Sequence, residues 1–481
     1  MAVSPELEGL RRIAPSRFVS FAFPNPFLGH ASNPYGDGGG GDGDAWECVR
    51  VAVLDSPLPA PADPATAAML VPSGRHRDWI FSTRAGHLHL LLSSTCFSRL
   101  VLVGPELSAP SPRVVSCVRR PDPDPAHARL LPLLLALCPM AAFRDNAVPD
   151  VPLLVFQDDL LGLAPIKFVS GPVVGEMVVE DVAIDCSPGP AELRRRMRFK
   201  RMPCLVQTQV RLCRSPAAAS SPLLEALEGS GELLQPEVGG SLVQPYLQAM
   251  VAGLAVIAPS IEESIRSGVR PRCLCAGVGG GSLLMSVRVG LQFDVIGIEA
   301  DGVVLDVARN HFGLVEDEFL HVHVDDAIQM IEGFARQGEP DMNFSAVMVD
   351  LDSSDAMCGV SAPPLEMTHG NVLISVRTIL HRHGILILNV IPPPADRSFY
   401  KGMIDLLRQV FSELYEIDVG NGENLVLIAT VSPIETTVTE GKSLVTKEEC
   451  FLAMYTPHLI QTLDNWAEAM AYQYVATRTM V

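Results

Sequence analysis

One segment near the middle of the chain, Arg272 to Ser282, limits most strongly what the chain can fold into. It begins with a short apolar run that predicts a buried strand, and Gly277-Val-Gly-Gly-Gly281 then ends that strand. A helix-compatible stretch follows, and a second apolar run, Phe293 to Ile298, leads directly into Glu299. Strand, glycine turn, helix, strand and acid in this order are typical of the mononucleotide-binding half of a doubly wound sheet.

Acidic residues also follow the next two strands that the pattern predicts. Asp325-Asp326 comes after the third apolar run and Asp350-Leu-Asp352-Ser-Ser-Asp355 after the fourth. Gly277, Gly279 and Gly281 would let the backbone approach a ligand, and Glu299 could accept hydrogen bonds from ribose hydroxyls. So many carboxylates would repel a phosphate-bearing cofactor and attract a sulfonium cation. We therefore expect a transferase that uses S-adenosylmethionine or a derivative.

Two readings of these motifs stay open at this point. A glycine turn can join a strand to a helix without binding anything, and Asp325 or Asp326 could simply cap the next helix. The acids after the fourth strand, Asp350, Asp352 and Asp355, are our candidate catalytic residues, because carboxylates can orient an amine and accept its proton. No Gly-Lys-Ser/Thr follows the glycine turn, so a P-loop is excluded.

No metal site is expected. The pairs His321/His323 and His381/His383 each lack a cysteine or a further histidine at zinc spacing. The chain has 36 basic and 55 acidic residues, a formal charge of −19, which argues against non-specific binding to DNA or RNA. Eleven cysteines without a C-x-x-C pair favour a reduced, cytoplasmic setting, and no transmembrane segment is visible.

The 481 residues are too many for one hydrophobic core, so we expect two or three domains. Short strand-like runs, Trp79 to Phe81 among them, predict an α+β domain in the N-terminal part, and apolar runs alternating with helical patterns predict an α/β domain with a mostly parallel sheet after it. The dense basic cluster Arg194 to Arg198 predicts a solvated strand face or, less strongly, a landing site for an acidic partner or RNA. The expected parts are residues 1–215 (α+β domain), 216–240 (linker), 241–435 (α/β domain) and 436–481 (helical extension).

At these motifs the chain resembles a known family. Cys275 to Leu283, Gly297-Ile-Glu299, His323 to Asp326 and Asp350 to Asp355 look like the spermidine-synthase-like class I methyltransferases. Further collinear similarity, from Val71-Pro-Ser-Gly-Arg75 to Gly384–Val390, is to the C-terminal half of the methyltransferase-like protein 13 family, which methylates elongation factor 1-alpha.

The resemblance implies a class I methyltransferase fold and an S-adenosylmethionine-dependent protein N-methyltransferase. The substrate would be the α-amino group, or a lysine, of elongation factor 1-alpha; no second glycine motif precedes residue 270, so the separate lysine-modifying domain is not expected. Gly277, Gly279 and Gly281 would line the cofactor, Glu299 would bind ribose and Asp326 would sit beside the adenine. One departure, Asp325-Asp326-Ala327 where the family usually has Ala-Asp-Gly, could alter adenine contacts.

Two alternatives remain. A polyamine aminopropyltransferase shares the fold and the Asp-Ser-Ser-Asp run, but true members carry an aspartate at the position of Gly279. A catalytically inactive methyltransferase fold could also serve as a binding module, against which the intact Glu299 and Asp326 count. The sequence leaves the oligomeric state open.

Overall fold

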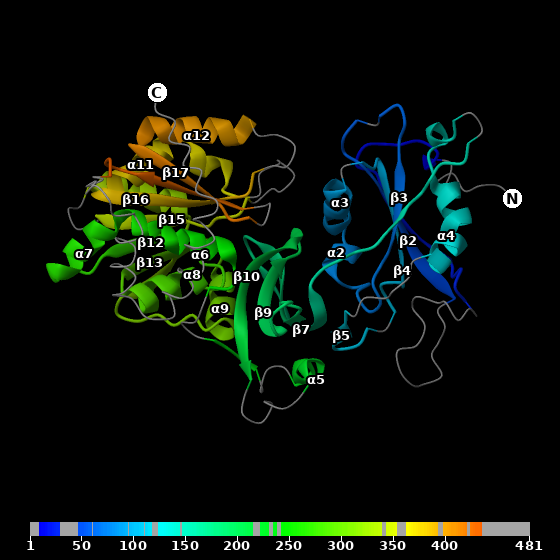
Figure 1. The fold of residues 1–481 in the computed structure, drawn as a ribbon, viewed down its shortest axis with the longest axis horizontal. Helices are drawn as coiled ribbons and strands as arrows, with labels where there is room; N and C mark the ends of the chain where they lie inside the picture. Colours follow the sequence, from blue (N-terminus) through cyan, green and yellow to red (C-terminus); the bar gives the residue numbers. More distant parts are fainter. Residues whose placement is uncertain are drawn as a thin grey trace. The chain divides into compact units, whose positions relative to one another are not determined.

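The computed structural model describes most of the chain, in two compact units (Figure 1). The first unit comprises residues 1–168, 176–206 and 213–235, and the second comprises residues 169–175, 207–212 and 236–481. The expected helical extension, 436–481, lies outside the described residues. These are 9–28, 47–59, 61–94, 96–109, 111–117, 124–144, 147–214, 222–229, 234–237, 242–338, 343–353, 362–392, 398–420 and 424–434.

The first unit contains a five-stranded sheet with helices on both faces, in the order β1-β2-β4-β3-β6. Alternate side chains of β2 point to opposite faces: Val51 packs with the leucines of α4, and Leu54 packs with α2 and α3. The elements are β1 (Phe18–Pro24), β2 (Cys48–Asp55), β3 (Thr66–Leu70), α2 (Trp79–Ser82), α3 (Arg84–Ser93), β4 (Arg99–Gly104), α4 (Asp124–Leu137) and β6 (Leu153–Leu154).

One sequence expectation for this unit is wrong. Trp79 to Phe81 forms the short helix α2 instead of a strand. Asp78 caps it, since its Oδ1 accepts a hydrogen bond from the backbone N–H of Ile80 at 3.1 Å. A three-residue apolar run carries no period that separates helix from strand, so the local cap decides.

A second sheet, in the order β11-β10-β9-β8-β7-β5, corrects the expectation for the basic cluster. Arg195, Arg196 and Arg198 lie on β9 and are buried, each paired with Glu180 or Asp181 of β8. The cluster is therefore an internal ion-pair network instead of a solvated face. The strands are β5 (Val115–Ser116), β7 (Leu160–Gly171), β8 (Gly175–Ile184), β9 (Glu192–Phe199), β10 (Met202–Arg214) and β11 (Leu234–Pro236), and helix α5 (Leu223–Glu228) precedes β11.

The second unit is built on a seven-stranded sheet in the order β14-β13-β12-β15-β16-β18-β17. Its first five strands are parallel and the last two run antiparallel to their neighbours, which confirms the doubly wound α/β fold expected from the sequence. The strands are β12 (Arg272–Ala276), β13 (Asp294–Glu299), β14 (Leu320–Val324), β15 (Phe344–Val349), β16 (Leu380–Val390), β17 (Glu413–Asp418) and β18 (Leu425–Thr430).

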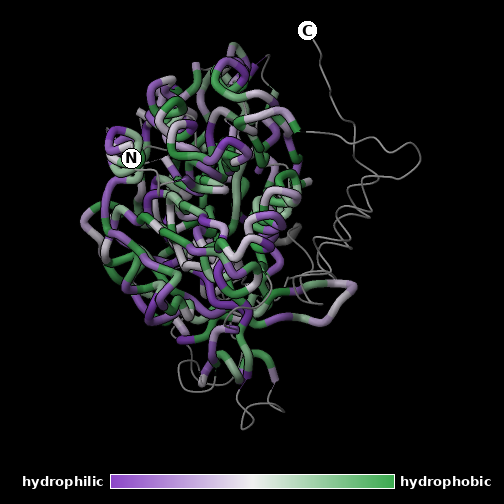
Figure 2. Tube along the Cα trace, turned by 90° about the vertical axis from the view of Figure 1, so that its left-hand side faces the viewer, coloured by the Kyte–Doolittle hydropathy of each residue, from purple (hydrophilic) through white to green (hydrophobic). Residues whose placement is uncertain are grey.

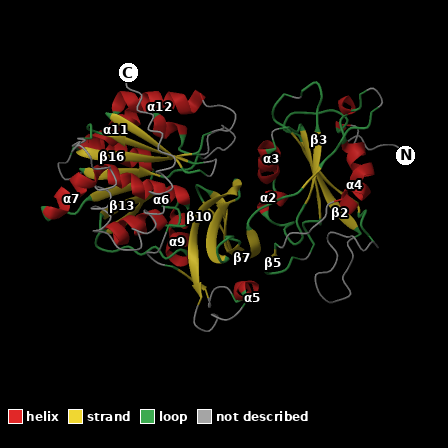
Figure 3. Ribbon diagram, viewed as in Figure 1, coloured by secondary structure: helices red, strands yellow, loops and turns green. Residues whose placement is uncertain are grey.

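Helices cover both faces of this sheet, which explains why its inner strands, such as β12 and β15, are mainly apolar. One face packs against α6 to α9 and the other against α10 to α12 (Figure 3). The helices are α6 (Pro245–Ala252), α7 (Ala258–Arg266), α8 (Ser282–Met285), α9 (Gly302–His311), α10 (Ala327–Gln337), α11 (Gly370–Ile379) and α12 (Ser398–Val410).

Along the chain, hydrophobic and hydrophilic stretches alternate (Figure 2). Within the described residues, none of the helices combines the length and the apolar character needed to cross a membrane.

The register of the parallel strands brings the polar residues of the second unit to one edge. Ala276, the last residue of β12, lies opposite Ile298 on one side and Val349 on the other. Gly277, Glu299 and Asp350 therefore leave three neighbouring strands at the same level. The strand order reverses between β12 and β15, and ligands of doubly wound sheets bind at the carboxyl ends of the strands at such a point.

Candidate active site at the carboxyl edge of the parallel sheet

The turn after β12 has a backbone that only glycine adopts without strain at two of its positions. Gly277 and Gly281 have φ angles of +88° and +83°. A Cβ atom at Gly277 would lie 2.1 Å from the carbonyl oxygen of Asp350, and one at Gly281 would lie 2.8 Å from Leu314. The turn is thus packed tightly against the start of the loop after β15.

Glu299 joins the glycine turn to the end of β13. Its carboxylate accepts hydrogen bonds from the backbone N–H groups of Val278 at 3.2 Å, Gly279 at 3.3 Å and Asp301 at 3.1 Å. The residue is 8% exposed, and burial raises the pKa of its carboxyl, against the opposing effect of the three N–H donors. A carboxylate has about four acceptor positions, so Glu299 keeps capacity for a further donor.

Asp350 lies at the centre of a network of neutral side chains. Its two carboxylate oxygens accept hydrogen bonds from the hydroxyl of Tyr246 at 3.1 Å and from Nδ2 of Asn389 at 2.9 Å. Asn424 in turn donates to Asn389 at 2.9 Å. Burial raises the pKa of Asp350 to about 6, the two hydrogen bonds oppose the rise, and the nearby charge of Asp352 adds to it. A carboxylate with a pKa near 6 is suited to accept a proton at neutral pH.

The remaining predicted catalytic residues follow Asp350 in the chain. Asp352 is half-buried, and its charge raises the pKa values of Asp350, Tyr246 and Glu299, so these groups share one electrostatic environment. Asp355 lies outside the described residues, and its role stays a prediction.

Asp326 has a structural task that the sequence left open. It is the N-cap of α10, where its Oδ1 accepts hydrogen bonds from the backbone N–H groups of Ile328 at 2.8 Å and Gln329 at 3.0 Å. Asp326 and Asp325 are both exposed at the end of β14. The capping bonds occupy one carboxylate oxygen of Asp326, and its contact with an adenine stays a prediction.

Two chain segments from outside the parallel sheet complete this part of the second unit. Residues 207–212 of β10 pass over the glycine turn, so that a Cβ atom at Gly280 would lie 2.4 Å from the hydroxyl oxygen of Thr208. The turn between β7 and β8 is held by Asp301, whose Oδ2 accepts hydrogen bonds from Val173 at 2.9 Å and Val174 at 3.0 Å. Residues of β10 therefore pack against the glycine turn, and Asp301 fixes the β7–β8 turn to the start of α9.

Next to the glycine turn, two buried polar atoms have no hydrogen-bond partner among the described residues. They are Nε2 of Gln207 and the hydroxyl of Ser282. Buried polar groups in folded proteins are nearly always paired, so each such atom calls for an explanation. Their place beside the turn suits a site that a polar ligand completes.

Sequence reasoning missed Tyr246, Asn424, Asp301 and Thr208. Tyr246 stands in an apolar helical segment 104 positions before its partner Asp350, so no local pattern marks it. Asp301 follows Glu299 closely and fits the N-cap preference of a helix start, which is the one signal that could have drawn attention to it.

Comparison with known proteins supports the similarity that the motifs indicate. No protein-family model matches the chain. The eEF1A lysine and N-terminal methyltransferase of Homo sapiens is 27% identical over 407 residues, covering 82% of this chain and 55% of that protein. The protein of the same name from Danio rerio is 29% identical over 373 residues, covering 75% of this chain and 50% of that protein.

The chain thus spans about half the length of the curated relatives it matches. Among solved structures, human methyltransferase-like protein 13 in complex with SAH is 27% identical, with a TM-score of 0.39, covering 44% of this chain and 91% of that chain. A probable spermidine synthase from Corynebacterium glutamicum is 14% identical with a TM-score of 0.40, covering 60% of this chain and 88% of that chain. The expected similarity to the eEF1A methyltransferases is therefore confirmed by sequence.

Proposed function

We propose that the second unit binds S-adenosylmethionine and methylates an amino group of a protein. The observation that carries the proposal is a pair of carboxylates, the buried Glu299 and the half-buried Asp350, without a countercharge among the described residues at the reversal point of the sheet. Glu299 and Asp350 are held only by neutral donors in the described part of the chain, and burial raises the pKa of both. Such a site attracts a cation and repels phosphate.

Specific residues would hold the cofactor. The backbone of Gly277, Gly279 and Gly281 would line it, Glu299 would accept hydrogen bonds from the ribose hydroxyls, and Asp326 would sit by the adenine. The spare acceptor capacity of Glu299 and the unpaired atoms beside the turn fit this assignment. When bound, the cofactor supplies an electrophilic methyl group on a sulfonium.

The protein's own groups would prepare the amine. The nitrogen must lose one proton before it attacks, and it must lie in line with the carbon–sulfur bond. Asp350, mostly ionised at neutral pH with a pKa of about 6, would orient the amine and accept a proton directly or through water, and Asp352 and Asp355 would share this task. One nitrogen–carbon bond forms and one carbon–sulfur bond breaks, without a metal or a covalent enzyme intermediate.

The proposed substrate is the α-amino group of elongation factor 1-alpha, with a lysine of that protein as the second possibility. Support comes from the relatives, which are named for lysine and N-terminal methylation of eEF1A. The nine cysteines of the described residues are free thiols, in keeping with action in the cytoplasm.

Gly279 argues against the aminopropyltransferase alternative. Its φ is +53°, a region that aspartate tolerates, and a Cβ atom there would meet nothing closer than Gln207 at 3.9 Å. The backbone thus has room for the aspartate that polyamine synthases carry, yet the chain has glycine and lacks that anchor for a second cation.

The direct test is to incubate the protein with labelled S-adenosylmethionine and purified elongation factor 1-alpha, and to map the labelled peptide. We expect label on the N-terminal peptide and none on substrate whose α-amino group has been acetylated. Asp352→Asn and Asp355→Asn should each slow the transfer. Wild-type rates in both variants would refute the roles of these two residues, and the absence of label on any peptide would refute this substrate.

A further inference from the structure

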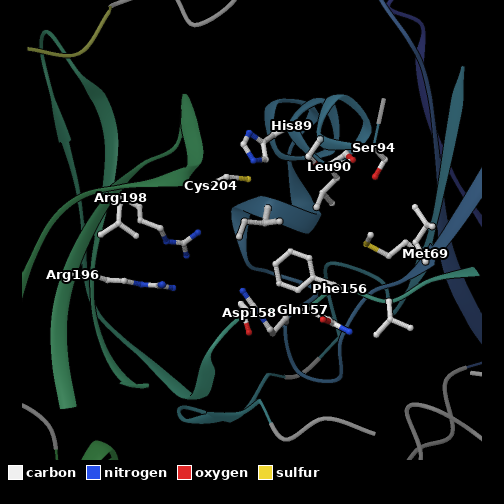
Figure 4. Close-up of a pocket in the computed structure, with 16 residues that line it drawn as sticks. Met69, His89, Leu90, Ser94, Phe156, Gln157, Asp158, Arg196, Arg198 and Cys204 are labelled. Carbon is white, nitrogen blue, oxygen red and sulfur yellow. Dashed lines mark hydrogen bonds and ion pairs between the residues drawn. The ribbon is translucent and has the colours of Figure 1, made fainter. Parts of the chain in front are cut away.

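The first unit contains a cavity of about 450 Å³ that the proposed methyl transfer does not use. Figure 4 shows arginines of β9 on one side, Phe156 near the centre and α3 beyond it. The volume lies within the range of about 300–1,000 Å³ that is usual for small-molecule sites. The lining is mixed, because polar and charged side chains, Gln157 and Asp158 among them, stand beside the apolar Met69, Ile80, Leu90, Leu154, Val155, Phe156 and Val206.

Two of the three arginines at this cavity are fully engaged by the protein. Arg75 donates to Asp78 at 2.8 Å and pairs with Asp158, and its guanidinium lies 5.1 Å from the ring centroid of Phe156. Arg198 donates to Glu180 through Nε and Nη2, at 2.5 and 3.1 Å, and through Nη1 to Asp78 at 3.0 Å. The N–H donors of Arg75 and Arg198 are thus taken up by protein carboxylates and are not available to a ligand.

Arg196 differs from its neighbours. The residue is 8% exposed, and in the described part of the chain its guanidinium makes one hydrogen bond, from Nε to Glu180 at 2.7 Å. Glu180 is shared with Arg198, so Arg196 has no carboxylate of its own. Its two terminal nitrogens carry four N–H donors, and the side chain points into the cavity (Figure 4).

A buried guanidinium with an unused pair of terminal nitrogens matches the geometry of a two-oxygen anion. Burial lowers the pKa of Arg196, and the charge of Glu180 opposes this effect. Phe156 lines the same cavity, beside the polar Gln157 and Asp158. A ligand that pairs with Arg196 and packs on the ring of Phe156 has an anionic head and a compact apolar or aromatic body.

We propose that this cavity is a binding site for a small carboxylate or phosphate monoester with a flat apolar body, anchored by the terminal nitrogens of Arg196. The site lies in the first unit, and it does not depend on the methyltransferase activity proposed for the second.

The probes are 4-fluorobenzoate and phenyl phosphate, with 4-fluorobenzamide as the uncharged analogue of the same shape. Fluorine NMR titration of the full chain should show saturable binding of 4-fluorobenzoate and binding of 4-fluorobenzamide that is about tenfold weaker or more. Competition by phenyl phosphate tells whether the head group accepted is carboxylate alone or also phosphate. Equal binding of the acid and the amide would overturn the proposal.

Variants of β9 assign the site. Arg196→Met should weaken 4-fluorobenzoate binding about tenfold or more, and its fold should hold because Arg198 still pairs with both oxygens of Glu180. Arg196→Lys keeps the charge without the paired donors and should bind with intermediate strength. Arg194→Met is the matched control, because Arg194 lies on the same strand but does not line the cavity. Wild-type affinity in Arg196→Met would overturn the assignment.

A readout in the unmodified protein avoids any question of folding. Cys204 lines the cavity, whereas Cys213, on the same strand β10, is exposed and does not. Mass spectrometry can measure the rate at which iodoacetamide alkylates each cysteine. Saturating 4-fluorobenzoate should slow the alkylation of Cys204 and leave the rate at Cys213 unchanged. Unchanged alkylation of Cys204 at saturation would show that the probe binds elsewhere and would refute the site.

Discussion

Replacing Asp350 with asparagine should abolish catalysis and at the same time stabilise the second unit. Burial raises the pKa of Asp350 to about 6, whereas an unfolded chain holds an aspartate near its ordinary value of about 3.9. The native state therefore binds the proton more tightly than the unfolded state. Stability from this group is present at low pH and is lost as the pH rises through about 6. Asparagine has the same shape and no charge to desolvate.

The two pKa values set the size of the effect. A difference of about two pKa units corresponds to roughly 3 kcal/mol at about pH 7.5, where the folded carboxyl is ionised. At about pH 5, where the folded carboxyl is mostly protonated, the same relation leaves roughly 1.5 kcal/mol. These are upper values, because Asp350 is half-buried and the amide of asparagine must adapt to the donors of Tyr246 and Asn389. The pH dependence of the difference is the signature.

Urea unfolding of wild type and Asp350→Asn at both pH values measures the difference in their free energies of unfolding. Hydrogen exchange of peptides from β12 and β15 reports on the second unit alone. Asp405→Asn, an exposed carboxylate on α12, is the control and should change stability by less than about 0.5 kcal/mol at either pH. If Asp350→Asn is less stable than wild type at about pH 7.5, or if the difference does not shrink toward about pH 5, the electrostatic reasoning is wrong.

Four further changes test other contacts. Tyr246→Phe removes a hydrogen bond that lowers the pKa of Asp350, so the acidic limb of the pH–kcat/KM profile should move up by roughly one pH unit; an unmoved limb would contradict the proton-accepting role. Gly277→Ala should abolish cofactor binding in calorimetry, because the new Cβ atom meets the Asp350 carbonyl, whereas Gly268→Ala, with a φ of +79° and open space around it, should cost about 1–2 kcal/mol and leave binding intact. Glu299→Gln should raise the dissociation constant of the cofactor about tenfold or more, and an unchanged constant would exclude the ribose contact. Asp301→Ala should expose the β7–β8 turn to proteolysis, since the backbone N–H groups of Val173 and Val174 in that turn lose their acceptor.

The parallel sheet was predictable from sequence because its inner strands are buried on both faces. Apart from β14, where His321 and His323 alternate with apolar residues, the predicted strands from Cys273 to Leu425 are mainly apolar runs, and those around the site end in glycine or acid. The shared level of Gly277, Glu299 and Asp350 then follows from the parallel register alone.

Features that depend on distant partners could not be predicted. Arg196 lies opposite Glu180 and Arg195 opposite Asp181 in the β8–β9 pairing, so the basic cluster is neutralised by acids that the sequence places in another strand. Without that register, a run of arginines is expected to face solvent. Tyr246 reaches Asp350 only once α6 packs on the sheet, and no local period marks such a contact.

The central claim, a cationic adenosyl cofactor at the carboxyl edge of the sheet, is tested most directly by calorimetry of the purified chain. We expect S-adenosylmethionine to bind, to bind more tightly than its decarboxylated form, and to lose affinity in Gly277→Ala but not in Gly268→Ala. Preference for the decarboxylated form would indicate aminopropyl transfer. Binding of neither compound would contradict the account and leave the second unit a methyltransferase fold without its cofactor.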